Sequence, residues 1–157
     1  MLHVSDHMTE RRFTFKDMAE DSNRAANYLH ALGIGKGDKV MLVLKRHYQF
    51  WPVVLACHKV GAVVIPATNQ LMTHDFTYRF KAGDVKAIFC TADGVTAEQA
   101  EEAEKELGAS LVKVLVNGKR PGWRAYDSEI HGYSSVYARP SDAPGGSDPM
   151  LMFFTSG

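Results

Sequence analysis

The residues of this chain with the clearest chemical potential are its last three, Thr155, Ser156 and Gly157. Small hydroxyl side chains and backbone N–H groups donate hydrogen bonds to phosphate oxygens, and glycine lets the backbone approach an anion closely. The apolar run at residues 150–154 precedes them and predicts a buried strand. Phosphate loops follow a strand and continue with glycines, a lysine and a helix. We therefore expect a piece of a nucleotide-using enzyme whose phosphate loop continues beyond Gly157.

A second candidate is the loop Ala67-Thr68-Asn69-Gln70, which follows an apolar run that ends at Ile65. Ligands of open α/β sheets gather at the carboxyl ends of the strands, so this loop is well placed for contact with a ligand. The alternative is a capped turn in which Asn69 and Gln70 bond to the backbone. Composition alone favours the capped turn.

Two other patterns carry less weight. Gly33, Gly35 and Gly37 follow a predicted helix and precede a predicted strand, the reverse of a dinucleotide-binding fingerprint, so we interpret them as a helix cap plus a turn. His3 and His7 stand four residues apart, which on a helix would place two metal ligands on one face. Only Asp6 could join them, so a terminal segment is the better interpretation than a metal site.

The remaining sequence alternates helical and strand patterns. Thr14 and Asp17 have the spacing of a capping box at the start of the first helix, and Gly33 can end it. Further helices are predicted at residues 49–60, 73–80 and 97–107, and strands at residues 40–44, 62–65, 87–90 and 112–116. Strands separated by helices favour crossover connections. We expect an α/β fold with a doubly wound, mainly parallel sheet flanked by helices.

Composition divides the chain and limits its partners. We expect an α/β subdomain at residues 1–138, a Pro- and Gly-rich flexible connection at 139–149, and a strand plus the start of the phosphate loop at 150–157. Eighteen basic and eighteen acidic residues give no net field for nucleic acid or an anionic membrane. No apolar stretch is long enough to span a membrane, and the first residues lack a secretory signal pattern.

The two cysteines, Cys57 and Cys90, lie in apolar segments and form no CxxC pair. Buried free thiols in a reducing compartment are the better interpretation than a disulfide. We therefore expect a cytoplasmic protein.

Four stretches together resemble the amino-terminal part of AMP-forming acyl-CoA synthetases, members of the adenylate-forming enzyme superfamily. They are residues 12–18 (RFTFKDM), 32–40 (LGIGKGDKV), 59–67 (KVGAVVIPA) and 153–157 (FFTSG). Residues 66–71 (PATNQL), followed by 75–79 (DFTYR), look most like the acetyl- to medium-chain acyl-CoA synthetase branch. The resemblance covers nearly the whole chain.

The resemblance implies a two-step ligase. A carboxylate attacks the α-phosphate of Mg²⁺-bound ATP to give an acyl-adenylate and pyrophosphate, and coenzyme A then displaces AMP to form the thioester. Thr155, Ser156 and Gly157 match the first three positions of the loop that wraps the ATP phosphates. Gln70 matches a position that lies near the coenzyme A path in medium-chain relatives. No residue of the chain matches a catalytic residue or a metal ligand of the family.

The same resemblance implies that the chain is an amino-terminal fragment, inactive by itself. It lacks the lysine of the phosphate loop, the adenine-binding motifs and the acyl pocket, and we expect the outgoing partner strand of residues 11–15 to be missing or degraded. We expect the apolar residues near 150–154 to drive self-association. An alternative of another class is a stand-alone, non-catalytic α/β nucleotide-binding or regulatory module.

Overall fold

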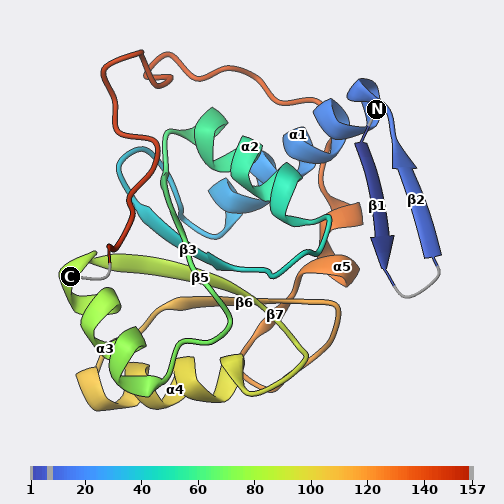
Figure 1. Cartoon of the computed structure of the whole chain (residues 1–157). Coiled ribbons are helices and arrows are strands. Elements are labelled where there is room, and N and C mark those ends of the chain that lie inside the picture. The colour runs from blue at the N-terminus through green and yellow to red at the C-terminus, as the bar shows by residue number, and fades with distance from the viewer. Residues whose placement is uncertain (1, 7–8, 156–157) are drawn as a thin grey trace.

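The computed structural model describes residues 2–6 and 9–155 and confirms the α/β fold (Figure 1). Its main sheet has five parallel strands in the order β4-β3-β5-β6-β7. The strands are β3 (Lys39–Val43), β4 (Val63–Pro66), β5 (Val85–Thr91), β6 (Val112–Val116) and β7 (Arg124–Ala125). The helices are α1 (Phe15–Ala31), α2 (Phe50–Val60), α3 (Thr73–Ala82), α4 (Thr96–Leu107), the short α5 (Tyr126–Glu129) and a 3-10 turn, η1 (Ile130–Gly132).

Both faces of the sheet are covered. Helices α1 and α2 pack together on one face, and α3 and α4 pack together on the other (Figure 1). Alternate residues of a strand point to opposite faces, so Val40 and Leu42 join the core beneath α1 and α2, while Met41 and Val43 join the core beneath α3 and α4. The continuous apolar sequence of β3 is explained by this burial on both sides.

The start and end of α1 follow the local sequence signals. The hydroxyl oxygen of Thr14 accepts from the Asp17 N–H at 3.1 Å, and the Asp17 carboxylate accepts from the Thr14 N–H at 2.8 Å. After the helix, Gly33 and Gly37 have φ of 75° and 83°, a left-handed region that favours glycine. These angles confirm the interpretation of the glycines as a helix cap and a turn.

The predicted missing partner of the strand near residue 11 is present, so that expectation was wrong. Strand β1 (Leu2–Asp6) pairs antiparallel with β2 (Thr9–Phe13), with Val4 opposite Arg11. The hairpin forms a separate two-stranded sheet outside the main core. Its first strand lacks the continuous apolar pattern by which buried strands are recognised, so no strand is predicted there from the residue pattern. His7 lies outside the described residues.

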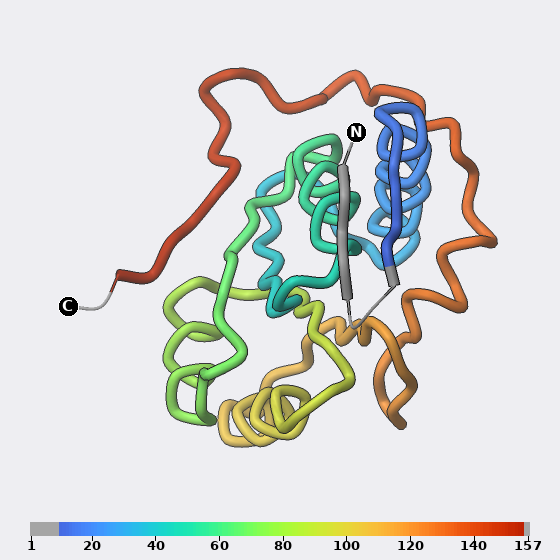
Figure 2. Tube along the Cα trace, turned by 45° about the vertical axis from the view of Figure 1, so that its right-hand side comes forward, coloured from blue at the N-terminus to red at the C-terminus, as the bar shows by residue number. Residues whose placement is uncertain are grey.

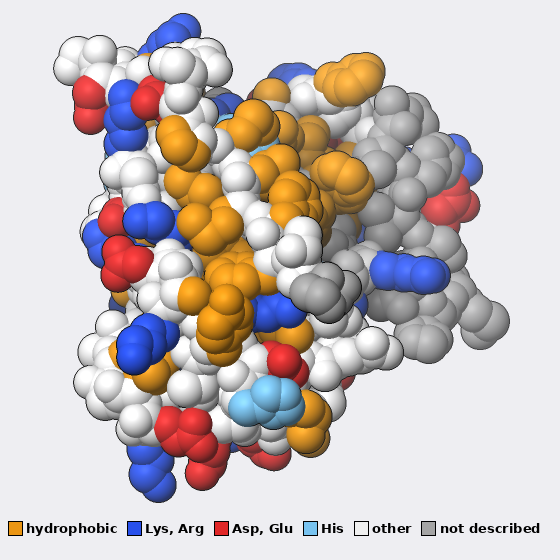
Figure 3. Space-filling model, turned by 60° about the vertical axis from the view of Figure 1, so that its left-hand side comes forward, with side chains coloured by type: hydrophobic (Ala, Val, Ile, Leu, Met, Phe, Trp, Pro, Cys, Tyr) orange, Lys and Arg blue, Asp and Glu red, His pale blue; other side chains and the backbone are white. Residues whose placement is uncertain are grey.

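The last part of the chain makes less sheet than its sequence predicted. After η1 the chain passes the ends of α1 and α2 and then descends beside β4 (Figure 2). Leu151 forms one parallel bridge with Val64, in which Met152 N–H donates to the Val64 carbonyl at 2.9 Å. None of the described residues covers the outer side of this segment, and Met150 and Phe153 are 50% and 67% exposed. Figure 3 shows hydrophobic side chains gathered in a band on this side of the molecule.

Cys57 and Cys90 are free, buried thiols, as the sequence predicted. No helix within the described residues is both long and apolar enough to cross a membrane.

Candidate functional site

Thr155 lies at the mouth of a cavity beside α3. The cavity has a volume of about 460 Å³, and its walls are Asp75, Tyr78, Arg79, Phe153, Phe154 and Thr155. Ser156 and Gly157, the other two residues assigned to the phosphate loop, lie outside the described residues. The structure therefore places only the first residue of the predicted loop.

Helix α3 supplies the charged groups of this cavity. The Arg79 guanidinium lies 5.2 Å from the centre of the Phe154 ring, and the Tyr78 ring meets the same ring edge-on at 5.9 Å. The Asp75 carboxylate accepts from the Met72 N–H at 3.0 Å and so caps the helix. A phosphate group beside Thr155 would meet one cation and one carboxylate, with no net positive charge. Among the described residues of this cavity, one hydroxyl and one guanidinium are the groups that could donate to an anion, and the Asp75 carboxylate opposes it.

Gln70 lies three residues before α3 begins at Thr73. Its side chain is exposed, and its backbone N–H donates to the Thr68 hydroxyl at 3.3 Å. The expected turn therefore forms, but the capping side chain is Thr68 and not Asn69 or Gln70. Gln70 is not among the walls of the Thr155 cavity, where Phe154 packs against Tyr78 and Arg79 further along α3. The structure does not bring the two predicted site segments together.

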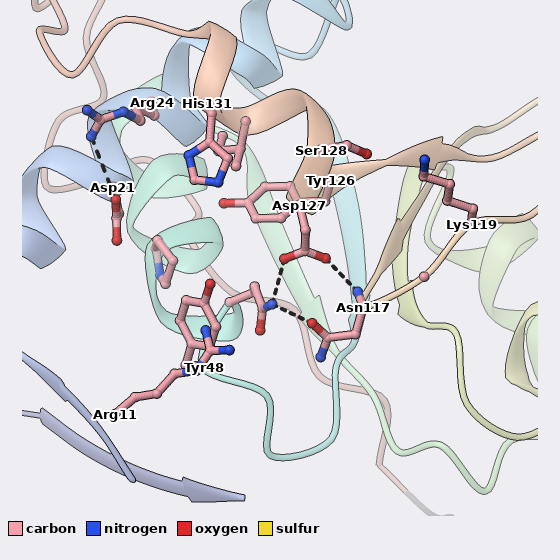
Figure 4. Close-up of a pocket in the computed structure, with 14 residues that line it drawn as sticks. Arg11, Asp21, Arg24, Tyr48, Asn117, Lys119, Tyr126, Asp127, Ser128 and His131 are labelled. Carbon is pink, nitrogen blue, oxygen red and sulfur yellow. Dashed lines mark hydrogen bonds and ion pairs between the residues drawn. The ribbon is translucent and has the colours of Figure 1, made fainter. Parts of the chain in front are cut away.

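A larger cavity, which sequence reasoning missed, opens on the α1 and α2 side of the sheet (Figure 4). Its volume is about 540 Å³, within the usual range of small-molecule sites. Its walls come from β2, α1, the start of α2, the turn after β6, α5 and η1. We call it the Gln49 cavity; the residues used below are Arg11, Asp21, Arg24, Tyr48, Gln49, Asn117, Gly118, Lys119, Tyr126, Asp127 and His131.

The amide of Gln49 organises the floor of this cavity. Gln49 is 1% exposed, and its Nε2 donates to Asn117 Oδ1 at 2.9 Å and to Asp127 Oδ1 at 2.7 Å. Asp127 Oδ2 also accepts from the Asn117 N–H at 2.6 Å. Because both neighbours of Nε2 are acceptors, the orientation of the amide is fixed. Its Oε1 is buried and has no hydrogen-bond partner among the described residues.

The same hydrogen-bond network continues to the carboxyl ends of β3 and β5, which are neighbours in the sheet. Asn117 Oδ1 accepts from Gln49, so the Asn117 Nδ2 group at 2.7 Å must donate to His47 Nδ1. His47 therefore carries its proton on Nε2, which lies 3.8 Å from Asp93 Oδ1. His47 and Asp93 follow neighbouring strands, β3 and β5, where the chain order of the sheet reverses direction. Open α/β sheets commonly bind ligands at such a point.

Electrostatics at this edge is set by hydrogen bonding and burial. Lys45 donates to Asp93, and this bond lowers the pKa of Asp93 to about 2. Burial raises the pKa of Tyr48 and Tyr126, so both phenols stay neutral at physiological pH. Among the described residues no three His, Cys, Asp or Glu side chains are grouped so that they could hold a metal ion.

Comparison with known proteins assigns the chain to a family. A family model described as "AMP-binding enzyme" matches residues 2–157. The chain belongs to the AMP-binding enzyme family. It is 33% identical over 156 residues to "Acyl-coenzyme A synthetase ACSM5, mitochondrial" of Mus musculus, covering 98% of this chain and 26% of that protein. It is 35% identical over 149 residues to "4-hydroxybutyrate--CoA ligase 1" of Metallosphaera sedula, covering 94% of this chain and 24% of that protein.

Solved structures agree on the fold. An anthranilate CoA ligase in complex with anthranoyl-AMP superposes with a TM-score of 0.84 at 17% identity, covering 94% of this chain and 28% of that chain. An acyl-CoA synthetase of Brucella canis superposes with a TM-score of 0.81 at 24% identity, covering 98% and 28%. The chain thus spans about a quarter of the length of the AMP-binding enzymes that it matches.

Proposed function

We propose that this chain is the amino-terminal part of an ATP-dependent, AMP-forming acyl-CoA ligase that activates a short- or medium-chain carboxylate. The observation that carries the proposal is the family match over residues 2–157, together with relatives named as acyl-CoA synthetase and CoA ligase. In the reaction, a carboxylate oxygen attacks the α-phosphorus of ATP and pyrophosphate leaves. The coenzyme A sulfur then attacks the acyl carbonyl, and AMP leaves.

Within this proposal, Thr155, Ser156 and Gly157 begin the loop that binds the ATP phosphates. The exposed Thr155 hydroxyl beside Arg79 supports the assignment, because both groups can donate to a phosphate oxygen. Gln70 is assigned to the coenzyme A path, and its exposure leaves it free to contact a ligand. Mg²⁺ would arrive with ATP, neutralising charge on the phosphates; no residue of this chain is assigned to it.

We further propose that the chain alone does not turn over. The relatives are about four times longer, and catalysis requires the phosphates, the metal and the carboxylate to be held at the same time. The test is to incubate the purified chain with ATP, Mg²⁺, coenzyme A and butyrate and to measure AMP. Turnover above the blank would contradict inactivity.

The ligase assignment itself is tested with the chain extended by the residues encoded downstream. A downstream sequence that resembles Thr-Thr-Gly-x-Pro-Lys, with AMP release that depends on both coenzyme A and an added acid, supports the ligase. A series of acids from acetate to decanoate then tests the chain-length proposal. If the lengthened protein folds but releases no AMP in response to any acid, the ligase assignment is contradicted.

A second candidate function is a non-catalytic nucleotide-binding or regulatory module. The observation that favours it is the Gln49 cavity, whose wall residues and Gln49–Asn117–Asp127 network all belong to this chain. A reading frame that ends naturally after Gly157, with ligand binding but no acid-dependent AMP release, would support the module over the ligase.

We also propose a reducing compartment, because both cysteines are buried free thiols, and the cytoplasm meets this condition. The relatives in mouse, rat and human carry the word mitochondrial in their names. Cell fractionation against a cytosolic and a mitochondrial marker decides between the two locations.

A further inference from the structure

We propose that the Gln49 cavity binds a small phosphate monoester that also carries an N–H or O–H donor. This site is separate from the Thr155 cavity, because the two share no wall residue and lie on opposite faces of the sheet. The proposal rests on two independent observations: a buried acceptor without a partner, and cations at the rim without a carboxylate partner.

The buried acceptor is Gln49 Oε1. A buried carbonyl without a hydrogen bond costs about 1–3 kcal/mol, so native proteins rarely leave one unsatisfied. Both donors of this amide are already used by Asn117 and Asp127, so the amide cannot be flipped without losing two bonds. Gln49 is one of the wall residues of the cavity, so its side chain lies next to the space that a bound molecule would occupy. A hydroxyl or amine of the ligand fits this position.

The cations at the rim are Arg11 and Lys119. The Arg11 guanidinium lies 5.0 Å from the centre of the Tyr48 ring, and neither residue forms an ion pair within the described part of the chain. Arg24, by contrast, lies 3.7 Å from Asp21 and is compensated. Asp127, the other acid of the cavity, is already engaged by two donors. The walls carry three cations and two carboxylates in all, so the cavity has a net charge of one positive unit, which favours an anion.

A phosphate monoester meets both requirements better than a simple ion. It carries about 1.5 to 2 negative charges at neutral pH, which suits more than one cation. Inorganic phosphate would fill little of a 540 Å³ cavity whose walls also include Pro52, Tyr126 and Ile130. Figure 4 shows Arg11 and Lys119 on different sides of the Asp127–Asn117 pair, so the ligand must extend between the floor and the rim.

The test uses the whole chain and nuclear magnetic resonance titration. AMP and glucose 6-phosphate are the two probes, because each combines a phosphate monoester with donors, and they distinguish a nucleotide from a sugar phosphate. Adenosine and inorganic phosphate serve as matched controls that carry one half of the chemistry. We expect saturable shifts of the Gln49 side-chain amide and of the Asn117, Gly118 and Lys119 amides with at least one probe, and binding at least about tenfold weaker for both controls.

Variants locate the site. The double variant Arg11→Met, Lys119→Met removes both unmatched cations from exposed positions, and we expect it to weaken the probe by about tenfold or more. Arg12→Met, Lys81→Met removes two exposed cations elsewhere and should leave the affinity unchanged. Loss of binding in Arg79→Met alone, with shifts around Thr155, would place the ligand in the other cavity and overturn the inference.

Two other results would also overturn the inference. The first is no saturable binding of either probe, which would mean that water satisfies Gln49. The second is equal affinity of the probe for the two double variants. None of these results depends on ATP turnover. The inference and the ligase proposal can therefore fail separately.

Discussion

Gln49 and Asn117 are 68 residues apart in the chain, and a 2.9 Å hydrogen bond between their side-chain amides joins the start of α2 to the turn after β6. Asn117 adopts φ of 59°, a left-handed conformation that asparagine tolerates better than most residues. In this conformation its backbone N–H also reaches Asp127. The bond thus ties two loops at the carboxyl edge of the sheet to α5.

We expect Gln49→Leu to lower the free energy of unfolding by about 1–3 kcal/mol, because Asn117 Oδ1 and Asp127 Oδ1 lose the donor that they share, the amide of the buried Gln49. Gln70→Leu makes the same chemical change at an exposed glutamine and should stay within about 0.5 kcal/mol of the parent. Urea denaturation of the three proteins measures both effects. Equal stabilities would show that the network contributes nothing.

Gly118 brings the turn after β6 against the turn after β5. A Cβ at this position would lie 2.4 Å from the Ala92 Cβ, well inside van der Waals contact. We expect Gly118→Ala to destabilise the fold by about 1–3 kcal/mol, because one of the two turns must move. At Gly146 nothing lies within 4 Å of an added Cβ, so Gly146→Ala is the matched control. Thermal unfolding measures the effect, and equal midpoint temperatures for the two variants would contradict the prediction.

The elements that a local pattern determines were predictable from the sequence. The Thr14–Asp17 cap depends on residues three apart, and β3 is recognised by its apolar run. By contrast, β7 is only Arg124–Ala125 and pairs through its backbone with Val114 and Leu115, so no side-chain periodicity marks it.

The candidate sites also differ in whether a local sequence pattern marks them. Thr155 was recognisable because a short motif followed an apolar run. The Gln49 cavity was not, because its walls come from six separate elements and none carries a motif. What makes Gln49 informative is an acceptor without a partner, and the sequence says nothing about which buried atoms are satisfied.

The Lys45–Asp93 contact gives a prediction about pH. Asp93 has an ordinary pKa of 3.8 and a folded-state pKa of about 2, so the contact stabilises the folded protein above about pH 4 and this contribution is lost as the pH falls toward 2. Because the Asp93 side chain is 58% exposed, solvent screening keeps the stabilisation below about 1 kcal/mol. In Lys45→Met we expect the pKa of Asp93 to rise toward 3.8, measured by carboxyl carbon resonance against pH. An unchanged pKa would exclude Lys45 as its main cause.

The two cysteines are predicted to be unreactive in the folded protein. Burial raises the pKa of Cys57 and of Cys90 to about 12, so almost no thiolate forms at neutral pH. We expect no reaction with a thiol-specific chromogenic reagent in buffer and two thiols per chain in denaturant. Rapid labelling of either cysteine without denaturant would show that its segment opens.

The exposed apolar side chains near the end of the chain predict self-association. Met150, Leu151 and Phe153 are 50%, 42% and 67% exposed beside β4, where the single bridge to Leu151 leaves the outer edge unpaired. Apolar patches and open edges promote pairing between chains. We therefore expect the chain to form a dimer that buries this segment, and Phe153→Asp to shift the equilibrium to monomer.

Light scattering across a concentration series measures the effect. Phe15→Asp is the matched control, because Phe15 is 87% exposed at the start of α1 and far from the segment in sequence. A chain that ends at Arg139 removes the segment altogether and should be monomeric, since its two cores lie mostly within the earlier residues. If the parent chain is also monomeric at the highest concentration, the exposed segment does not drive association. If Phe15→Asp disrupts the dimer as strongly as Phe153→Asp, the contact lies elsewhere on the surface.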